Sequence, residues 1–158
     1  MATDTHIKFD GVEGEATHKD HPKEIEVLSW SHGVSNMSHG SGGGAGKGKA
    51  DPNPFTFSHY YDKASPTLMK YASNGKHFPT VVLTARKSGE GQKDFIKITM
   101  KEVFVTSIMP AGDGSGNIHE TVSLAYSDIE YGYKPQDGKG GLGGEVKFGW
   151  NVKESTFR

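Results

Sequence analysis

The glycines and lysines of residues 39–50, HGSGGGAGKGKA, are the part of the sequence with the most obvious potential for chemistry. Residues 43–50 follow the spacing G-x-x-x-x-G-K of a phosphate-binding loop, which needs a Ser or Thr next to bind magnesium. Ala50 stands at that position and has no hydroxyl. Such a loop must also lead into a helix, and the two prolines of 51–55, DPNPF, oppose one. The sequence therefore favours a long loop without a nucleotide, and a nucleotide hydrolase remains a minor alternative.

Other residues with catalytic or metal-binding potential have no supporting motif. His18 and His21 have the spacing H-x-x-H, but no second pair of ligands accompanies them, and the other six histidines are scattered along the chain. Each histidine is therefore interpreted as structural. The chain has no cysteine and no G-x-S-x-G sequence. We predict no catalytic, cofactor-binding or metal-binding residue, and a protein that is not an enzyme.

The charge and hydropathy of the chain exclude further classes of function. The 158 residues carry a formal net charge of −1, whereas a nucleic-acid-binding surface is basic. No segment approaches the roughly 18 apolar residues that a membrane-spanning helix needs. The first residues, MATDTHIKFDGVEGE, lack the basic start and apolar run of a secretory signal peptide. We expect a cytoplasmic protein that another machine would have to export.

Alternation of apolar and polar residues predicts strands along most of the chain. In 119–133, for example, Val122 and Leu124 alternate with small polar residues. The predicted strands cover 5–12, 24–35, 54–61, 80–87, 94–109, 119–133 and 145–152. Two glycine-containing segments are expected to join consecutive strands as hairpin loops, namely 87–94 and 111–117.

One segment has a helical pattern instead. Ser65 is suited to the N-cap, Pro66 to the first turn and Gly75 to the end, which predicts a short helix at about 65–74. The expected fold is mostly β, a β-barrel of two packed antiparallel sheets. One short helix and a long, extended glycine-rich loop complete a single domain, 1–158.

The order of these segments resembles the hemolysin-coregulated protein family, Hcp, whose members form the tube of the type VI secretion system. The resemblance extends through nearly the whole chain, and its most specific parts are EIEVLSWS and the ending VKFGWNV. It is carried by HIKF (6–9), GVEGE (11–15), HPKEIEVLSWSHGVS (21–35), the glycine loop, FSHYYDKASPTLM (57–69), SNGKHFPTVVLTARKSG (73–89), FIKITMKEVFVTSI (95–108), ETVSLAYSDIEYGYKPQ (120–136) and VKFGWNV (146–152).

This resemblance implies a hexameric ring and a hollow tube of stacked rings inside a contractile sheath. It also implies a tip (spike) protein, and effector proteins that are carried in the lumen and exported when the sheath contracts. The tube protein is then secreted without a signal peptide. A monomeric β-barrel that binds a small ligand or a carbohydrate is the alternative of a different class.

Alternation within 24–35 suggests which residues face such a lumen. Leu28 and Trp30 share one face, which we assign to the core because burying Trp30 is favourable. Ser29, Ser31 and Gly33 then point away from the core, and this small, uncharged face suits contact with a carried effector. An ordinary solvent face or a face between subunits explains the same alternation equally well.

The glycine-rich loop is expected to contact the next ring of the tube. A connection of this length is usually functional or disordered. The residues assigned to ring stacking are Gly42, Gly43, Gly44, Lys47 and Lys49. The two lysines would pair with acidic residues of the next ring. Within a ring, the long strands at 94–109 and 119–133 are candidates for the edge that meets the neighbouring subunit.

Overall fold

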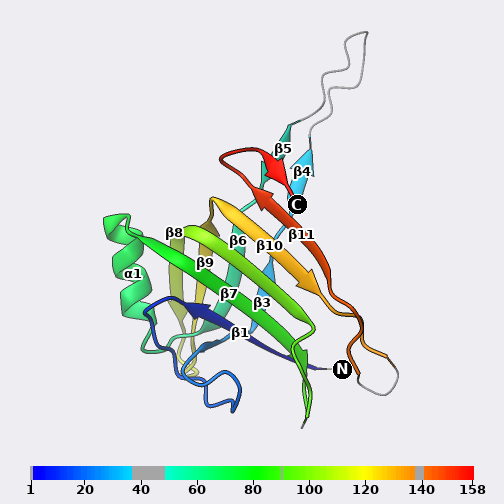
Figure 1. Ribbon diagram of the computed structural model, residues 1–158. Coiled ribbons are helices and arrows are strands. Elements are labelled where there is room, and N and C mark those ends of the chain that lie inside the picture. Colours follow the sequence, from blue (N-terminus) through cyan, green and yellow to red (C-terminus); the bar gives the residue numbers. More distant parts are fainter. Residues whose placement is uncertain (1, 37–48, 90, 138–140) are drawn as a thin grey trace.

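The computed structural model of the chain describes residues 2–36, 49–89, 91–137 and 141–158 (Figure 1). The structure is mostly strand, as predicted, and contains one helix in this part of the chain. The elements are β1 (Thr3–Phe9), β2 (Ile25–Glu26), β3 (Ser29–Ser31), β4 (Val34–Asn36), β5 (Ala50–Pro52), β6 (Phe55–Tyr60), α1 (Ser65–Asn74), β7 (His77–Lys87), β8 (Ile96–Gly112), β9 (Ile118–Ala125), β10 (Asp128–Tyr133), β11 (Val146–Asn151) and β12 (Thr156–Phe157).

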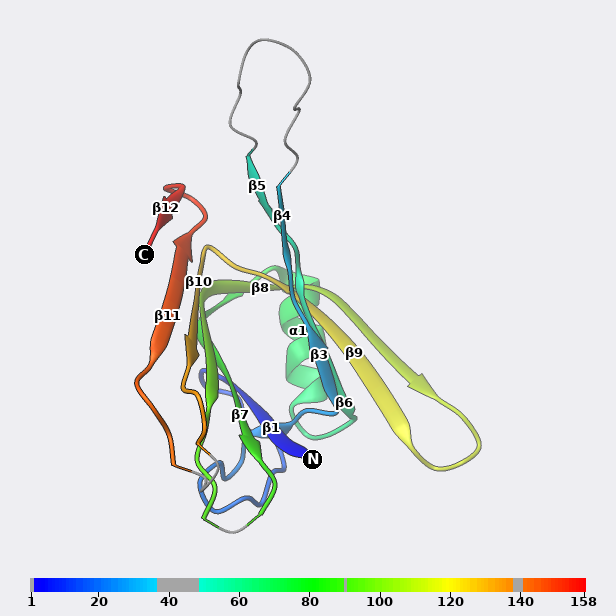
Figure 2. The ribbon, with the colours of Figure 1, turned by 90° about the vertical axis from the view of Figure 1, so that its right-hand side faces the viewer.

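Two antiparallel layers form the barrel, and β8 belongs to both (Figures 1 and 2). The first half of β8 pairs with β7 and β10, and this layer continues to β1 and β2 on one side and to β11 and β12 on the other. The second half of β8 pairs with β9, which pairs with β6, which pairs with β3. We call this second layer, β3–β6–β9–β8, the β3–β9 sheet.

A local break in pairing lets β8 pass from one layer to the other. Its register with β7 skips Glu102 and Pro79, and Glu102 has a φ of 53°. A proline has no N–H to give to a ladder, and a left-handed residue bends the strand. A second register shift lies between Val105 and Ser107 on the β9 side. The predicted strand 94–109 is therefore continuous but bent.

The segment 24–35, predicted as one strand, is divided into three short ones. β2 pairs with β1 and β3 pairs with β6, and between them the Val27 N–H donates to the Thr5 carbonyl (2.9 Å). The next N–H, of Leu28, donates to the Ser58 carbonyl (2.8 Å). The chain thus crosses from one layer to the other and covers that side of the barrel. Leu28 lies at this crossing and is 46% exposed, so its assignment to the core is wrong.

The core lies between the two layers, and α1 packs at its side. Phe9, Phe57 and Phe78 are buried together, with ring centroids 5.0–5.9 Å from Phe9. Leu68 of α1 is fully buried, and Tyr71 stacks on Phe78 at 4.2 Å. The helix is therefore held to the barrel by its apolar face.

The bounds of α1, Ser65–Asn74, are those predicted, and only the assignment of the N-cap differs. Gly75 has a left-handed φ of 71°, and its N–H donates to the Tyr71 carbonyl, so the predicted stop is confirmed. The N-cap position belongs to Ala64 rather than to Ser65, which is the buried first residue of the helix. No side chain caps the helix, but Asp62 holds the N-cap residue in place, because its Oδ1 accepts the Ala64 N–H at 2.9 Å.

Two hairpin predictions are confirmed, and one strand prediction is corrected. β7–β8 and β8–β9 are antiparallel pairs, joined through the segments predicted as hairpin loops. The predicted strand 119–133 is two strands, β9 and β10, which separate at 126–127 and join different layers.

No helix in the described part of the chain is long and apolar enough to cross a membrane.

Candidate functional site

The outer face of the β3–β9 sheet is covered by small hydroxyl side chains. Alternation along each strand places every second residue on this face. Ser29 lies opposite Ser58, and their Oγ atoms are 2.5 Å apart. Thr56 Oγ1 and Ser123 Oγ form a second cross-strand hydrogen bond, 3.1 Å long. The hydroxyl face, as we call it, consists of Ser29, Ser31, Thr56, Ser58, Ser107, Thr121 and Ser123.

The hydroxyl face carries no formal charge over these strands. Its described residues include no acid, lysine or arginine, and Tyr60, Met109 and His119 lie toward its far end. Two of the predicted residues, Ser29 and Ser31, are exposed on it. Hydroxyls exchange hydrogen bonds with water or with a passing chain at little net cost. The face can therefore contact varied polypeptides without binding one of them tightly.

The opposite side of the same strands is firmly packed. Trp30 stacks on Phe55, with centroids 5.8 Å apart and planes 10° apart, and Phe55 and Phe57 are buried. The prediction that Trp30 faces the core is confirmed, because it packs against the core cluster. A rigid backing of this kind holds the hydroxyls at fixed positions.

Gly33 lies beyond the end of β3 and is not part of the hydroxyl face. Its carbonyl accepts the Asn53 N–H (3.1 Å), and a Cβ added to Gly33 would be 3.1 Å from Asn53 Nδ2. The structure therefore brings Ser29 and Ser31 together with hydroxyls of other strands and leaves Gly33 at a turn toward β4.

His32 attaches the end of β3 to the other layer. Its Nδ1 and Nε2 each lie 2.5 Å from a tyrosine hydroxyl, those of Tyr131 and Tyr126 respectively. The Tyr126 hydroxyl donates to the Asn53 carbonyl (3.0 Å), so His32 Nε2–H donates to Tyr126 and Nδ1 accepts from Tyr131. Burial lowers the pKa of His32 and raises the pKa of Tyr131 to about 12. The neutral network fixes the direction in which the chain leaves the barrel.

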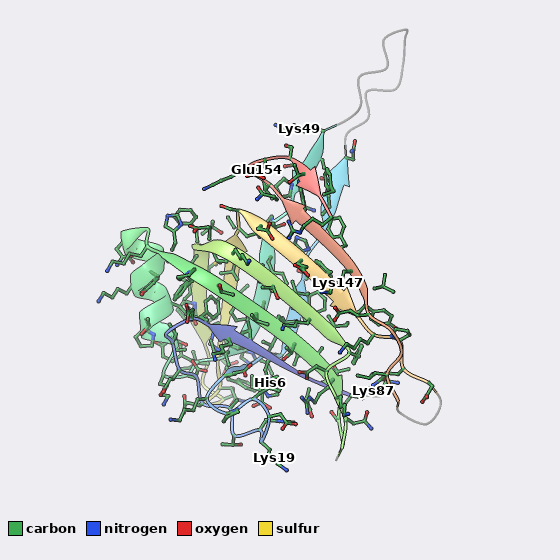
Figure 3. All side chains as sticks on the ribbon, viewed as in Figure 1. His6, Lys19, Lys49, Lys87, Lys147 and Glu154 are labelled. Atoms are coloured by element: carbon green, nitrogen blue, oxygen red, sulfur yellow. The ribbon has the colours of Figure 1, made fainter. Side chains whose placement is uncertain are left out.

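The two ends of the glycine-rich loop are paired as strands. β4 and β5 form an antiparallel ladder that projects from the barrel, in which Val34 lies opposite Pro52 and Asn36 opposite Ala50 (Figures 1 and 2). Lys49 precedes β5 and is exposed (Figure 3). The other residues assigned to ring stacking lie outside the described residues, namely Gly42, Gly43, Gly44 and Lys47. The arm, defined here as residues 34–52, thus has a paired base that the sequence did not predict.

A buried histidine–glutamate pair lies directly behind the hydroxyl face. His59 Nε2 is 2.9 Å from Glu120 Oε1, and both side chains are fully buried. Asp62 Oδ2 lies 3.9 Å from the other ring nitrogen of His59. The pair joins neighbouring positions of β6 and β9 in the register of the two strands. Each side chain supplies the other with a partner in a site closed to water, and removal of either leaves the other without it.

Three histidines are gathered at a second place, on the opposite layer. His6 of β1 stacks on His21 (centroids 4.9 Å apart) and meets the edge of His18 (5.2 Å). Alternation had no means of bringing these residues together. Among the described residues, no group of three His, Asp or Glu side chains is placed to hold a metal ion.

Residues 6–133 match the family model described as type VI secretion system effector, Hcp. The chain belongs to the Hcp family. It is 42% identical to protein hcp1 of Pseudomonas aeruginosa over 160 residues, which cover 99% of each chain. A solved type six secretion system protein has a TM-score of 0.92 and 32% identity, covering 99% of this chain and 100% of its own. Hcp1 from Salmonella typhimurium has a TM-score of 0.81 and 33% identity, with both chains fully covered.

These comparisons confirm the resemblance that the sequence motifs indicated. The mostly β fold, with two antiparallel layers and one short helix, is that of the Hcp proteins. The matching family is a type VI secretion family and not a catalytic one. Alternation within 24–35 indicated two residues of the hydroxyl face of this Hcp chain, Ser29 and Ser31, and not those on the other strands. Their signal was present in the alternations FTFSHY and ETVSLA, where Thr56, Ser58, Thr121 and Ser123 share one side.

Proposed function

We propose that this Hcp chain is a non-enzymatic structural subunit of the inner tube of a type VI secretion system. Six copies form a ring, rings stack into a hollow tube, and the hydroxyl face lines the lumen. The tube is assembled in the cytoplasm and exported with a tip protein when the surrounding sheath contracts. The observation that carries the proposal is the uncharged hydroxyl face, because a channel for varied cargo must hold proteins briefly and then release them.

The open edges of the β3–β9 sheet support a ring. From Ser107 to Gly112, β8 pairs with β9 on one side, and none of the described strands pairs with its other side. At the opposite margin, β3 pairs with β6 alone in this part of the chain. Unpaired strand edges are rarely left exposed in soluble proteins. Joining the β8 edge of one copy to the β3 edge of the next is a heterologous contact, which closes into a ring.

Negative-stain electron microscopy and size-exclusion chromatography test the ring directly. We expect particles with a central hole and an elution volume corresponding to six subunits. A monomeric elution volume under the same conditions would contradict the proposal and favour the ligand-binding monomer.

Substitution of Ser31 tests the lumen. Ser31→Gln adds a longer side chain to the hydroxyl face, and we expect intact rings that retain less of a co-expressed effector protein during chromatography. Ser73→Gln is the matched control, because Ser73 is exposed on α1, away from this face. Equal effector retention by the Ser31 and Ser73 variants would refute the lumen assignment.

The arm is proposed to join one ring to the next. It carries Lys49 at the described end, and Lys47 lies in the same basic, glycine-rich sequence. Deletion of 40–48 is expected to leave single hexamers and to weaken tubes. Tubes of normal length from the deletion variant, seen by electron microscopy, would show that stacking does not depend on the arm.

A further inference from the structure

A folded segment between β1 and β2, residues 13–24, covers part of the outer side of β1 and β7. We call it the clasp. Five backbone hydrogen bonds lie within it, and three of them join its two ends: Gly14 N–H to the Lys23 carbonyl (2.7 Å), Lys23 N–H to the Ala16 carbonyl (2.8 Å), and Ala16 N–H to the Glu24 carbonyl (2.9 Å). Figure 3 shows His6 on β1 beside the clasp and Lys19 at the clasp's outer side.

Polar contacts, more than apolar burial, attach the clasp to the barrel. Arg86 of β7 donates to Asp20 of the clasp (2.7 Å) and to Asp94 (2.8 Å). His21 places Nδ1 3.0 Å from Glu24 and Nε2 3.1 Å from Asp94. Ala16 is the one apolar side chain of the clasp that is buried. A segment held in this way opens when its charges change, while the core stays packed.

His6 is the group in this cluster whose charge the structure disfavours most. It is 3% exposed, and its Nδ1 has no hydrogen-bond partner. Its ring stacks on His21 with the planes 13° apart and meets the edge of His18. Burial, followed by the charges of His21 and His18, lowers the pKa of His6 to about 4. In the closed clasp, His6 is therefore mostly neutral near neutral pH.

A protonated His6 would find no hydrogen-bond acceptor for its Nδ1–H in the closed clasp. The charged and titratable groups around the ring come from every element packed against it: Asp4 on β1, Glu26 on β2, Arg86 on β7, Asp94 after β7, and His18, Asp20, His21 and Glu24 of the clasp. Protonation would place a buried positive charge against the ring of His21 and near the Arg86 guanidinium, which lies 3.2 Å from His21 Nε2. Separation of His6 from the clasp relieves this repulsion and gives the ring access to water.

We propose that the clasp is an acid-released latch, in which protonation of His6 drives residues 13–24 away from β1 and β7 while the barrel remains folded. The latch does not depend on the proposed ring or tube, because every group involved lies within one chain. The sign follows from linkage. The closed state binds fewer protons than the open one, so opening becomes more favourable as the pH falls from about 6.5 toward 4.

The same linkage gives the size of the effect. For a histidine with a pKa near 6.5 when open and about 4 when closed, lowering the pH from 7 to 5 raises the opening equilibrium about 20-fold. Asp and Glu side chains with ordinary pKa values remain mostly ionised at pH 5, so a change from pH 7 to pH 5 mainly alters the charge of histidines.

Hydrogen–deuterium exchange with mass spectrometry measures the opening on the intact protein. After correction for the intrinsic exchange rate at each pH, peptides covering 13–24 should lose about 20-fold in protection between pH 7 and pH 5. Peptides covering β7 should retain theirs. Equal changes in the clasp and in β7, or no change in either, would overturn the proposal.

Three variants assign the effect to His6. His6→Phe keeps an aromatic ring without a proton to gain, and the pH dependence of the clasp should disappear. His77→Phe, at an exposed histidine, is the matched control and should keep the wild-type response. Gly14→Ala should open the clasp even at pH 7, because the new Cβ would lie 2.5 Å from the Glu24 carbonyl oxygen.

A titration of the wild-type protein makes the test independent of how well His6→Phe folds. The Cε1 proton of His6, followed by NMR, should titrate with a midpoint below 5. A midpoint of 6 or higher, or a wild-type pH response in His6→Phe, would show that His6 does not control the clasp.

Discussion

The two layers of the barrel share one core but differ in the chemistry of their free faces. The β3–β9 sheet presents small hydroxyls, among them Ser29 and Ser58, and no acid, lysine or arginine along its described face. The other layer presents a charged ladder in which Lys147 lies 3.2 Å from Glu145 and 3.8 Å from Glu130 (Figure 3). One packed core can therefore support a face for transient contacts on one layer and a face of solvated charges on the other.

Histidines have opposite roles in the two layers. Behind the hydroxyl face, His59 is fully buried and paired with Glu120. On the other layer, His6 is nearly as buried and has two histidine rings as neighbours, and its Nδ1, like that of His59, has no hydrogen-bond partner. His59 has a buried acid as its partner, whereas burial and two neighbouring histidines lower the pKa of His6. Both differences can be tested by mutation and by pH.

The largest expected effect is loss of the buried pair. Glu120→Ala leaves His59 without its partner in a site closed to water, and we expect the free energy of unfolding to fall by about 3–5 kcal/mol. Urea denaturation measures this value. Glu102→Ala is the control, because Glu102 pairs with His77 at the exposed surface and should cost less than about 1 kcal/mol. Similar losses in both variants would mean that burial does not distinguish the two pairs.

A smaller effect is expected from the His6 site when the pH changes. Because its pKa is lowered to about 4 in the folded state, its contribution to stability is complete above pH 6.5 and is lost as the pH falls toward 4. Between pH 7 and pH 5 this loss should reach about 1–2 kcal/mol, measured by urea denaturation. Over the same pH interval, the free energy of unfolding of wild type should fall by that amount relative to that of His6→Phe. If the two proteins differ by the same free energy of unfolding at pH 7 and at pH 5, His6 does not lose stability on protonation, and its proposed difference from His59 is wrong.

The smallest effect is expected on the hydroxyl face itself. Thr121 and Val122 are neighbours in β9 that point to opposite sides, and Val122 is fully buried. Thr121→Ala should change the free energy of unfolding by less than about 0.5 kcal/mol, whereas Val122→Ala should cost roughly 2 kcal/mol. A large loss from Thr121→Ala in thermal or urea denaturation would indicate a face that is packed within the subunit.

Local sequence patterns were sufficient for most elements and for the direction of most side chains. Val122 and Leu124 were expected on one side of a strand, and both are buried. Gly75 was expected to end the helix and does so in a left-handed conformation. These predictions succeed because alternation and helix termination depend on a few neighbouring residues.

Burial was harder to predict than direction. In β11, Trp150 and Val146 lie on the same side, yet Trp150 is buried and Val146 is exposed. β11 lies near the edge of its layer, so only one end of this face reaches the core. Leu28 fails for a related reason, since the chain crosses between layers at that residue. Burial depends on what covers a face, and the covering residues are distant in sequence.

The sequence by itself determined a mostly β chain with one helix, the membership of the Hcp family and an uncharged face at Ser29 and Ser31. Only the tertiary structure decided that Thr56, Ser58 and Ser123 extend this face, and that His6 meets His21. The physical reason is that side-chain alternation repeats every second residue, within the reach of local sequence. Strand pairing and ring stacking join residues across long separations, and they depend on how the whole chain packs.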